Sequence, residues 1–560
     1  MDNQRLILFV ALSLVTLLLW QAWQEEHSTA TRPAPVSVPA SGTTSPAAES
    51  PADLPGPAVS PATTPEAGPD GPPGEATKAI PKGERIHVRT DVLDLVIDTN
   101  GGDIRSVKLP KYPVSIDQPD VPYQLLTDQP PYLFVAQAGL KSTAPAPTHH
   151  ARYQVSQQVF TLQPGEETLE VPLVWEQDGV KVTKTFRLTR GSYVVDIVFK
   201  VDNRRSEPWR GSQYRQFQRT EDTGAPRSRL IYTYTGGVIY SPEDKYEKID
   251  FEEMQERDLG RRIVGGWAAM IQHYFLAAWL PAADETNFFY SKVPAPERYI
   301  LGLISTEKTI AAGDSGVFST RAYLGPKVQD VLADLAEGLE LTVDYGILTF
   351  LAKPLFWLLK QIHALVGNWG WSIVLLTLII KLAFYKLSAA SYRSMANMRR
   401  LAPKIQQLRE RYGEDRQRMS KAMMDLYKKE KINPMGGCLP MLVQIPVFIA
   451  LYWVLLESVE LRQAEFILWI KDLSTKDPYY VLPLLMGASM LLQQKLHPPP
   501  PDPVQAKVMM VLPIVFTLFF AFFPSGLVLY WVANNIFSMA QQWYVMHQHE
   551  KAIAKAKGSH

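Results

Sequence analysis

Five apolar runs of 16 to 20 residues follow one another near the end of this 560-residue chain, and one of them contains a lysine. The runs cover roughly residues 369–388, 437–456, 478–494, 508–523 and 527–545. Runs of this length can cross the ~30 Å hydrocarbon core of a bilayer as helices. The stretch "LLTLIIKLAFYKLS" places Lys381 inside the first run, and a lysine at the centre of a membrane helix costs roughly 2.5–3.5 kcal/mol on insertion scales. The sequence therefore predicts a polytopic α-helical membrane protein. The energetic cost of Lys381 in the membrane calls for a structural or functional explanation.

The charges between the runs predict their orientation. Residues 386–431 carry 13 Lys and Arg against 5 Asp and Glu, whereas residues 457–477 carry 3 against 5. Loops rich in Lys and Arg stay in the cytoplasm, so we expect the first loop inside and the second outside. With one further run at the N-terminus, this predicts six spans with both termini in the cytoplasm.

The N-terminal part of the chain consists of an apolar run and a proline-rich segment. Residues 1–27 fit an uncleaved membrane anchor, since Trp20 and Trp23 suit the membrane interface. A signal peptide cleaved near Ser28–Ala30 is the alternative. Residues 28–80 hold 12 prolines and no aromatic residue, which predicts a disordered tether because too little apolar surface is available to offset the entropy of ordering.

Residues 81–330 have the pattern of an all-β domain. Segments such as "HVRTDVLDLVIDT" and "VKVTKTFRLT" alternate apolar and polar residues, with turn signals such as Asp178-Gly179 between them. This predicts a large antiparallel β-sandwich on the outer side of the membrane. Cys438 is the only cysteine of the chain, so no intramolecular disulfide and no cysteine-based metal site is expected.

Residues 331–366 are predicted to form amphipathic or interfacial helices. Their second half, Tyr345 to Val366, is apolar but carries Lys353, Lys360 and His363. That mixture favours a helix lying in the plane of the interface, while a spanning helix stays the alternative.

The rest of the chain divides into four predicted parts. Residues 367–390 form the second span. Residues 391–433 show heptad spacing and many basic residues, which predicts two short helices paired as a cytoplasmic hairpin; an ordinary solvated basic loop is the alternative. Residues 434–546 hold four further spans, and residues 547–560 form a short cytoplasmic tail.

Two interpretations of Lys381 remain open from the residues alone. Its side chain can snorkel towards the cytoplasmic boundary, which Lys386 marks, or it can face a hydrophilic cavity inside the helix bundle. Polar side chains within the other runs favour the cavity, because such groups usually face the bundle interior. They are Thr377, Gln444, Thr517, Asn534, Asn535 and Ser538. A positive cavity attracts either a transported anion or acidic peptide segments.

The motifs of several catalytic classes are absent from the sequence. It contains no Walker-type glycine loop, no H-E-x-x-H and no intramembrane-protease G-x-S-G. The formal net charge of +1 does not indicate a nucleic-acid partner. We therefore expect neither enzymatic activity, nor a cofactor, nor a bound metal.

The segment "NPMGGCLPMLVQIPVFIALYWVL", Asn433 to Leu455, closely resembles the signature of the YidC family of membrane protein insertases, relatives of the Oxa and Albino proteins. The signature residues are Asn433, Pro434, Gly437, Cys438, Pro440, Gln444 and Pro446. The resemblance includes "GNWGWSIVLLTLIIK" and "FPSGLVLYWVANN" in matching order. With its anchor, tether and external β domain, the chain resembles the Gram-negative form of the family along its whole length.

The resemblance implies a protein that inserts newly made membrane proteins into the bacterial inner membrane and helps them fold. Family members act alone or beside the Sec translocon, and the hairpin is the expected contact for ribosomes or targeting factors. Lys381 stands where the family has a basic residue in a substrate groove. Many relatives have arginine there, and lysine keeps the charge but loses the bidentate fork. Tyr530 and Trp531 stand at a position where an aromatic residue contacts substrate.

Two other functions are open to the sequence. A secondary transporter could use Lys381 as an anion site, which predicts inverted repeats, and no such internal symmetry is visible. The β domain resembles the super-sandwich of sugar-epimerising enzymes, so it could process sugars. It has no convincing His/Glu constellation for that chemistry, and a structural or partner-binding role is preferred.

Overall fold

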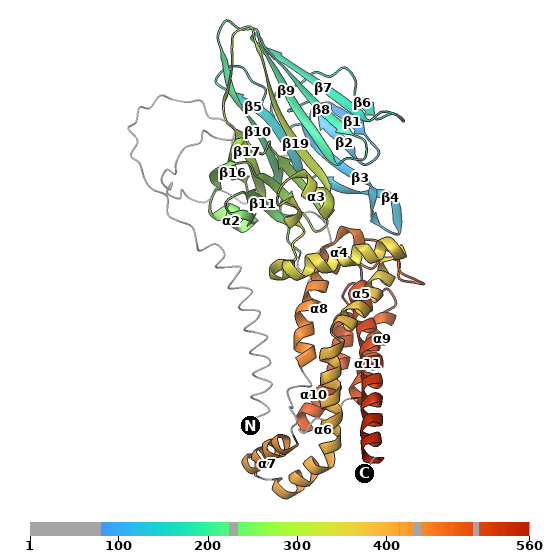
Figure 1. Ribbon diagram of the computed structural model, residues 1–560. Coiled ribbons are helices and arrows are strands. Elements are labelled where there is room, and N and C mark those ends of the chain that lie inside the picture. Colours follow the sequence, from blue (N-terminus) through green and yellow to red (C-terminus); the bar gives the residue numbers. More distant parts are fainter. Residues whose placement is uncertain are drawn as a thin grey trace, which may run out of the picture.

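The computed structural model describes residues 80–558, except 223, 225–232, 414, 431–438 and 497–502. Figure 1 shows a β domain that stands on one end of a helical region. The predicted anchor (1–27) and almost all of the predicted tether (28–80) lie outside the described residues.

The β domain is a sandwich of two sheets, which confirms the predicted architecture. The 11-stranded sheet contains β1 (Arg85–Arg89), β2 (Asp94–Asp98), β3 (Asp103–Ser115), β4 (Gln118–Leu126), β5 (Phe134–Ser142), β6 (Val159–Thr161), β10 (Trp209–Arg219), β13 (Gly260–Val264), β16 (Thr286–Ala295), β17 (Arg298–Ser305) and β18 (Lys308–Ile310). The 8-stranded sheet contains β7 (Thr168–Gln177), β8 (Val180–Thr189), β9 (Val194–Asn203), β11 (Gly236–Ser241), β12 (Lys245–Ile249), β14 (Trp267–Ile271), β15 (Phe275–Leu280) and β19 (Ser315–Pro326). The strand pairs are antiparallel apart from β1 with β6.

Alternation of buried and more exposed residues explains why these segments form strands. In β8, every second residue from Val180 to Leu188 faces the core between the sheets. Lys184 occupies one of these inward positions, and its ammonium donates hydrogen bonds to the carbonyls of Gly101, Gly102 and Ala138 at 3.1, 2.8 and 2.8 Å. Burial lowers the pKa of Lys184 to about 8. Three carbonyl dipoles from the facing sheet thus replace the water that this lysine gives up.

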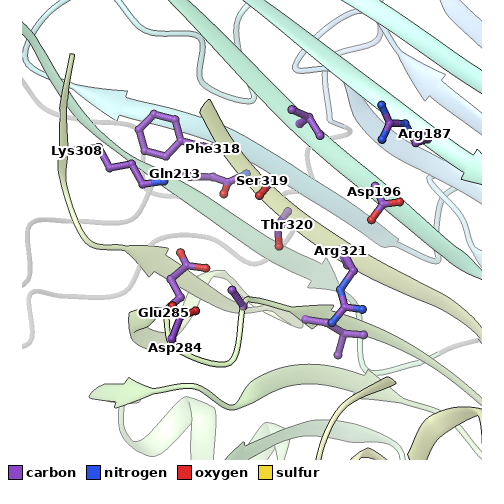
Figure 2. Close-up of a pocket in the computed structure, with 13 residues that line it drawn as sticks. Arg187, Asp196, Gln213, Asp284, Glu285, Lys308, Phe318, Ser319, Thr320 and Arg321 are labelled. Atoms are coloured by element: carbon purple, nitrogen blue, oxygen red, sulfur yellow. The ribbon is translucent and has the colours of Figure 1, made fainter. Parts of the chain in front are cut away.

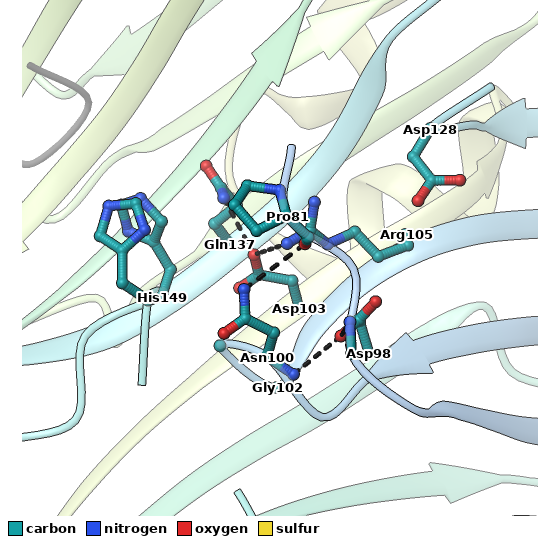
Figure 3. Close-up of polar contacts among 12 residues, drawn as sticks. Pro81, Asp98, Asn100, Gly102, Asp103, Arg105, Asp128, Gln137 and His149 are labelled. Atoms are coloured by element: carbon teal, nitrogen blue, oxygen red, sulfur yellow. Dashed lines mark hydrogen bonds and ion pairs between the residues drawn. The ribbon is translucent and has the colours of Figure 1, made fainter. Parts of the chain in front are cut away.

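A second buried polar group lies at the start of β3 (Figure 3). The side chains of Asp103 and Arg105 form an ion pair at 3.2 Å, and Gln137 Nε2 donates to Asp103 Oδ2 at 2.9 Å. Close by, Asn100 Nδ2 donates to the carbonyl of Pro81 at 3.4 Å. The buried guanidinium is thus matched by a carboxylate that a neighbouring amide orients, and the start of the described chain is bonded to the same sheet.

The helical region follows the last strand. Its elements are α3 (Gln329–Leu335), η1 (Leu339–Thr342), η2 (Gly346–Leu348), α4 (Thr349–Val366), α5 (Trp369–Ala383), α6 (Tyr385–Tyr412), α7 (Arg416–Lys429), α8 (Leu439–Glu457), η4 (Val459–Leu461), α9 (Val481–Leu496), α10 (Pro503–Phe520) and α11 (Ser525–Gly558). One short helix, α2 (Phe251–Glu256), belongs to the β domain.

Within the described residues, no single helix combines the length and the hydropathy that crossing a membrane requires. The pair Trp369–Ala383 and Tyr385–Leu401 meets both requirements only when its members are taken together, and it bends by 69° at the break. Val443–Glu457 and Lys507–Phe520 are shorter apolar helices. The break lies at Phe384, whose backbone angles (φ −91°, ψ 11°) leave the helical range, so the predicted span 367–390 is not one straight helix.

Helix α4 is amphipathic and lies across the top of the helical region (Figure 1). Phe356 and Leu359 are buried, and α4 packs against α5 and α8. Phe350, Trp357 and Leu365 point away from that packing and are well exposed. A helix with one packed face and aromatic residues on the other suits the border between lipid and water.

Helices α6 and α7 pack against each other as a hairpin at the far end of the molecule (Figure 1). Lys404 of α6 forms an ion pair with Glu430, just after α7, at 2.6 Å. Helix α6 has 28 residues, so it is much longer than the short helix expected from the heptad spacing. Because it begins directly after the break at Phe384, it includes residues that the sequence assigned to the second span.

A buried ion pair joins the two parts of the molecule. Lys327, which directly follows β19, and Glu457, the last residue of α8, approach to 3.3 Å and are almost fully buried. The ammonium of Lys327 also donates to the carbonyl of Thr342 at 3.1 Å. Each charge therefore depends on the other, because neither has bulk water to replace its partner.

Two further contacts surround this ion pair. Arg462 donates to the carbonyls of Pro113 and Val114, in β3, at 2.6 and 3.2 Å. The ring of His273 bonds the carbonyl of Leu456 through Nε2 at 2.9 Å. Burial and the nearby Lys327 lower the pKa of His273 to about 3, so the neutral ring donates this bond near pH 7. The β domain is thus held at the end of α8 by polar contacts.

We expect Lys327 and Glu457 together to stabilise the protein more than either charged side chain does when the other is removed. Glu457→Leu leaves the buried Lys327 ammonium without its carboxylate, which should lower the free energy of unfolding by about 3–5 kcal/mol. The loss should be seen as a lower thermal midpoint in detergent and as faster proteolysis between the two parts. The double variant Lys327→Met/Glu457→Leu should recover most of the loss. A loss of stability in the double variant equal to the sum of the losses in the two single variants would contradict the coupling.

Glu460, in η4, predicts a pH dependence at the same junction. Burial raises its pKa to about 7, above the value of an unfolded chain, so its contribution to stability is present below about pH 4.5 and is lost as the pH rises through 7. Glu460→Gln should therefore stabilise the protein by about 1–3 kcal/mol at pH 8 and hardly at all at pH 4.5. Thermal melts of both proteins across this range measure the difference; a constant offset would contradict the assignment.

Candidate functional site

Four polar side chains meet among the apolar helices, and we call them the polar cluster: Lys381, Gln444, Asn534 and Ser538. The Lys381 ammonium donates to Ser538 Oγ at 2.7 Å and to Gln444 Oε1 at 3.3 Å. Gln444 Nε2 donates in turn to Asn534 Oδ1 at 2.9 Å. These bonds connect α5, α8 and α11 at one level, and only 7 % of the Lys381 surface is exposed.

The geometry of α11 explains how the cluster forms. Asn534 and Ser538 are four residues apart and so lie on one face of the helix. The Ser538 hydroxyl donates to the Asn534 carbonyl at 2.6 Å, which leaves its oxygen free to accept from Lys381. Tyr392, in α6, donates its hydroxyl to the carbonyl of Ser538 at 3.5 Å. The break after α5 allows α6 to approach α11 there.

The charge of Lys381 has no counter-ion in the described part of the chain. Among the residues that the structure describes, no carboxylate forms an ion pair with it, and its hydrogen-bond partners are a neutral amide and a hydroxyl. Because the side chain bonds α8 and α11, it points into the helical region and does not snorkel along α5. The cluster thus places a positive charge among neutral polar groups inside the helical region.

Two of the predicted groove residues use their hydroxyls elsewhere. Thr377 donates to the carbonyl of Ile373, and Thr517 donates to that of Pro513, each at 2.7 Å. A threonine hydroxyl reaches the carbonyl four residues earlier without leaving its helix. Sequence patterns cannot distinguish such a locally satisfied threonine from one that faces a cavity.

The other predicted residues lie beside the cluster. Asn535 donates to Ser489 of α9 at 2.9 Å, on another side of α11. Tyr530 is buried. The ring of Trp531 packs edge-on against Phe448, with 4.5 Å between ring centroids. These contacts join α11 to α8 and α9.

Of the signature residues, Asn433, Pro434, Gly437 and Cys438 lie outside the described residues. Pro440 and Pro446 belong to α8. Gln444 lies between them and joins the cluster.

Ser538, one of the polar residues noted within the last apolar run, joins the cluster. The sequence prediction omits Tyr392, because its approach to α11 depends on the bend at Phe384.

Comparisons with known proteins identify the family. Residues 85–358 match the family of YidC periplasmic domains, and residues 361–552 match the family described as 60Kd inner membrane protein. The membrane protein insertase YidC of Methylococcus capsulatus is 52% identical over 560 residues, which cover 99% of this chain and 100% of that protein. The chain belongs to the YidC family of membrane protein insertases. This confirms the resemblance drawn from the signature around Pro440, and it disfavours the transporter hypothesis.

Two solved structures give weaker likenesses. A crystal structure of an active YidC insertase aligns with 83% of this chain and 94% of its own, at 18% identity and a TM-score of 0.39. A galactose mutarotase related enzyme from Lactobacillus acidophilus aligns with 43% of this chain and 97% of its own, at 10% identity and a TM-score of 0.29. Both scores are too low to support an argument about function.

The missing counter-ion predicts that Lys381 does not stabilise the fold. Lys381→Met should leave the thermal midpoint in detergent unchanged or raise it, because a buried ammonium without a carboxylate is costly. Lys386→Met, at an exposed position five residues later, is the matched control. A clear drop with Lys381→Met alone would make this lysine a structural residue.

Proposed function

We propose that this chain inserts newly synthesised membrane proteins into the bacterial inner membrane through a hydrophilic groove that contains Lys381, and helps them fold there. Family membership supports the activity. The observation that supports the groove is the Lys381 ammonium, which is buried among apolar helices with only neutral partners.

An uncompensated positive charge lowers the barrier to translocation. Acidic or polar segments of a substrate must cross about 30 Å of hydrocarbon, which is costly. Lys381 offers such a segment a transient counter-ion part-way across, and Gln444 and Asn534 replace some of its water. The apolar part of the substrate then leaves sideways into lipid because of its own hydrophobicity, so no nucleotide is required.

The proposed membrane arrangement has six spans, with both termini in the cytoplasm and the β domain in the periplasm. Helix α4 lies in the periplasmic interface. Helix α10 has 18 residues and is about 27 Å long at the helical rise of 1.5 Å per residue, which is slightly less than the ~30 Å of hydrocarbon. A helix shorter than the hydrocarbon thins the bilayer locally, which shortens the path that a polar segment must cross.

The hairpin of α6 and α7 is the proposed contact for ribosomes or targeting factors. A groove of about 770 Å³ lies between the two helices and is lined by both basic and acidic side chains, among them Lys404, Arg411, Lys429 and Asp425. Cooperation with the Sec translocon is also part of the proposal. Both follow from the family resemblance, and no contact in the chain itself identifies either partner.

The test is insertion of a small membrane protein with an acidic tail into membranes depleted of the native insertase. Wild type is compared with Lys381→Arg, Lys381→Ala and Lys381→Glu. The arginine variant should retain insertion, whereas Ala and Glu should slow it about tenfold, which corresponds to roughly 1.4 kcal/mol.

Two controls separate charge from folding. Lys386→Ala changes an exposed lysine on the neighbouring turn and should insert like wild type. A substrate with a neutral tail should depend less on Lys381 than the acidic one. Equal insertion of the acidic substrate by all four proteins would remove Lys381 from the mechanism.

A further inference from the structure

The 8-stranded sheet has a notch where one strand stops short. Strand β15 ends at Leu280, which pairs with Arg321 of β19. Residues 315–320 of β19 pair with β9 on one side, and no strand in the described part of the chain pairs with them on the other. A cavity of about 670 Å³ occupies this place (Figure 2). We call it the β19 notch.

A lysine side chain bonds the free edge of β19. Lys308, in β18 of the other sheet, donates from its ammonium to the carbonyl of Val317 at 3.1 Å. Lysines often protect strand edges in this way, because a row of unpaired backbone groups would otherwise pair with another chain. Lys308 is exposed, so its side chain can move aside without opening the core.

Two buried polar atoms in the notch have no hydrogen-bond partner among the residues with described positions. They are Gln213 Nε2, a donor, and Thr320 Oγ1, which can accept, and these residues are only 1% and 4% exposed. Figure 2 places both side chains between Lys308 and Arg321. Unsatisfied buried groups are costly, and each peptide unit offers one acceptor and one donor. The pair therefore matches a segment of backbone.

The charges of the lining balance. Three residues are acidic and three are basic: Asp196, Asp284, Glu285, Arg187, Lys308 and Arg321. Arg187 is already paired with Glu170, and Glu285 with Arg215. Phe318 and Leu280 add apolar surface. This lining does not select a strongly charged ligand such as a phosphate, and recognition must come from main-chain pairing and shape.

We propose that the β19 notch binds an extended, uncharged segment of another polypeptide, which adds as a strand beside residues 315–320. The added strand takes over the Val317 carbonyl from Lys308, and its peptide groups satisfy Gln213 and Thr320. Strand addition of this kind obtains affinity from the main chain and tolerates many side chains. The site is separate from the polar cluster at Lys381 and serves segments on the periplasmic side.

The experiment measures binding of a fluorescent octapeptide to the full-length protein in lipid nanodiscs by anisotropy. The peptide alternates threonine and valine and has blocked ends. An otherwise identical peptide, N-methylated at every second residue, cannot pair along one edge and should not bind. Lys308→Ala should bind the octapeptide about threefold more tightly, because the lysine no longer competes for Val317, and Thr320→Val should bind it about threefold more weakly.

Controls and competitors decide among the possible occupants. Lys200→Ala removes an exposed lysine of β9 and should leave the affinity unchanged. Equal binding of the N-methylated peptide, or an unchanged affinity in Lys308→Ala, would overturn the proposal. Displacement of the octapeptide by maltotetraose would assign the notch to saccharides, and self-association that the peptide competes away would assign it to a second copy; either result also refutes it.

Discussion

The desolvation of one ammonium group governs the helical region. Lys381 is surrounded by apolar helices, and its hydrogen-bond partners among the described residues are the neutral oxygens of Gln444 and Ser538. A carboxylate beside Lys381 would stabilise the buried ammonium by forming an ion pair, but it would also cancel the positive charge. The protein instead keeps a partly satisfied cation, and the packing of α5, α8 and α11 must supply the stability that the cluster does not. A site that attracts negative charge is thus maintained at the expense of local stability.

Comparison of three buried lysines shows how the surroundings decide the role of a charge. Lys184 is surrounded by backbone carbonyls that cannot move, and Lys327 is neutralised by Glu457. Both arrangements are closed and suit a structural purpose. Lys381 differs because its partners, Gln444 and Ser538, are neutral side chains; in the proposed function an incoming anion replaces them. The same residue type therefore serves the β core, the junction and the proposed groove through different partners.

Much of this organisation was readable from the sequence, and the reasons for the failures are physical. Alternating residues such as those of β8 indicate a sandwich because burial repeats every two residues. Lys381, Gln444 and Asn534 stand out because polar groups are rare in apolar runs. Thr377 misleads because a hydroxyl can bond its own helix. The bend at Phe384 has no local marker such as proline or glycine.

Helix α11 supplies partners to three other helices: Ser538 to Lys381 in α5, Asn534 to Gln444 in α8, and Asn535 to Ser489 in α9. It is also the last of these helices in the chain. During biosynthesis, Lys381 and Gln444 can therefore bond each other before α11 exists, whereas the bonds to Ser538, Asn534 and Asn535 form only when the final segment has left the ribosome. Until then the lysine is at its most attractive to any nearby carboxylate. Completion of the C-terminal helix is thus the step that completes the polar cluster.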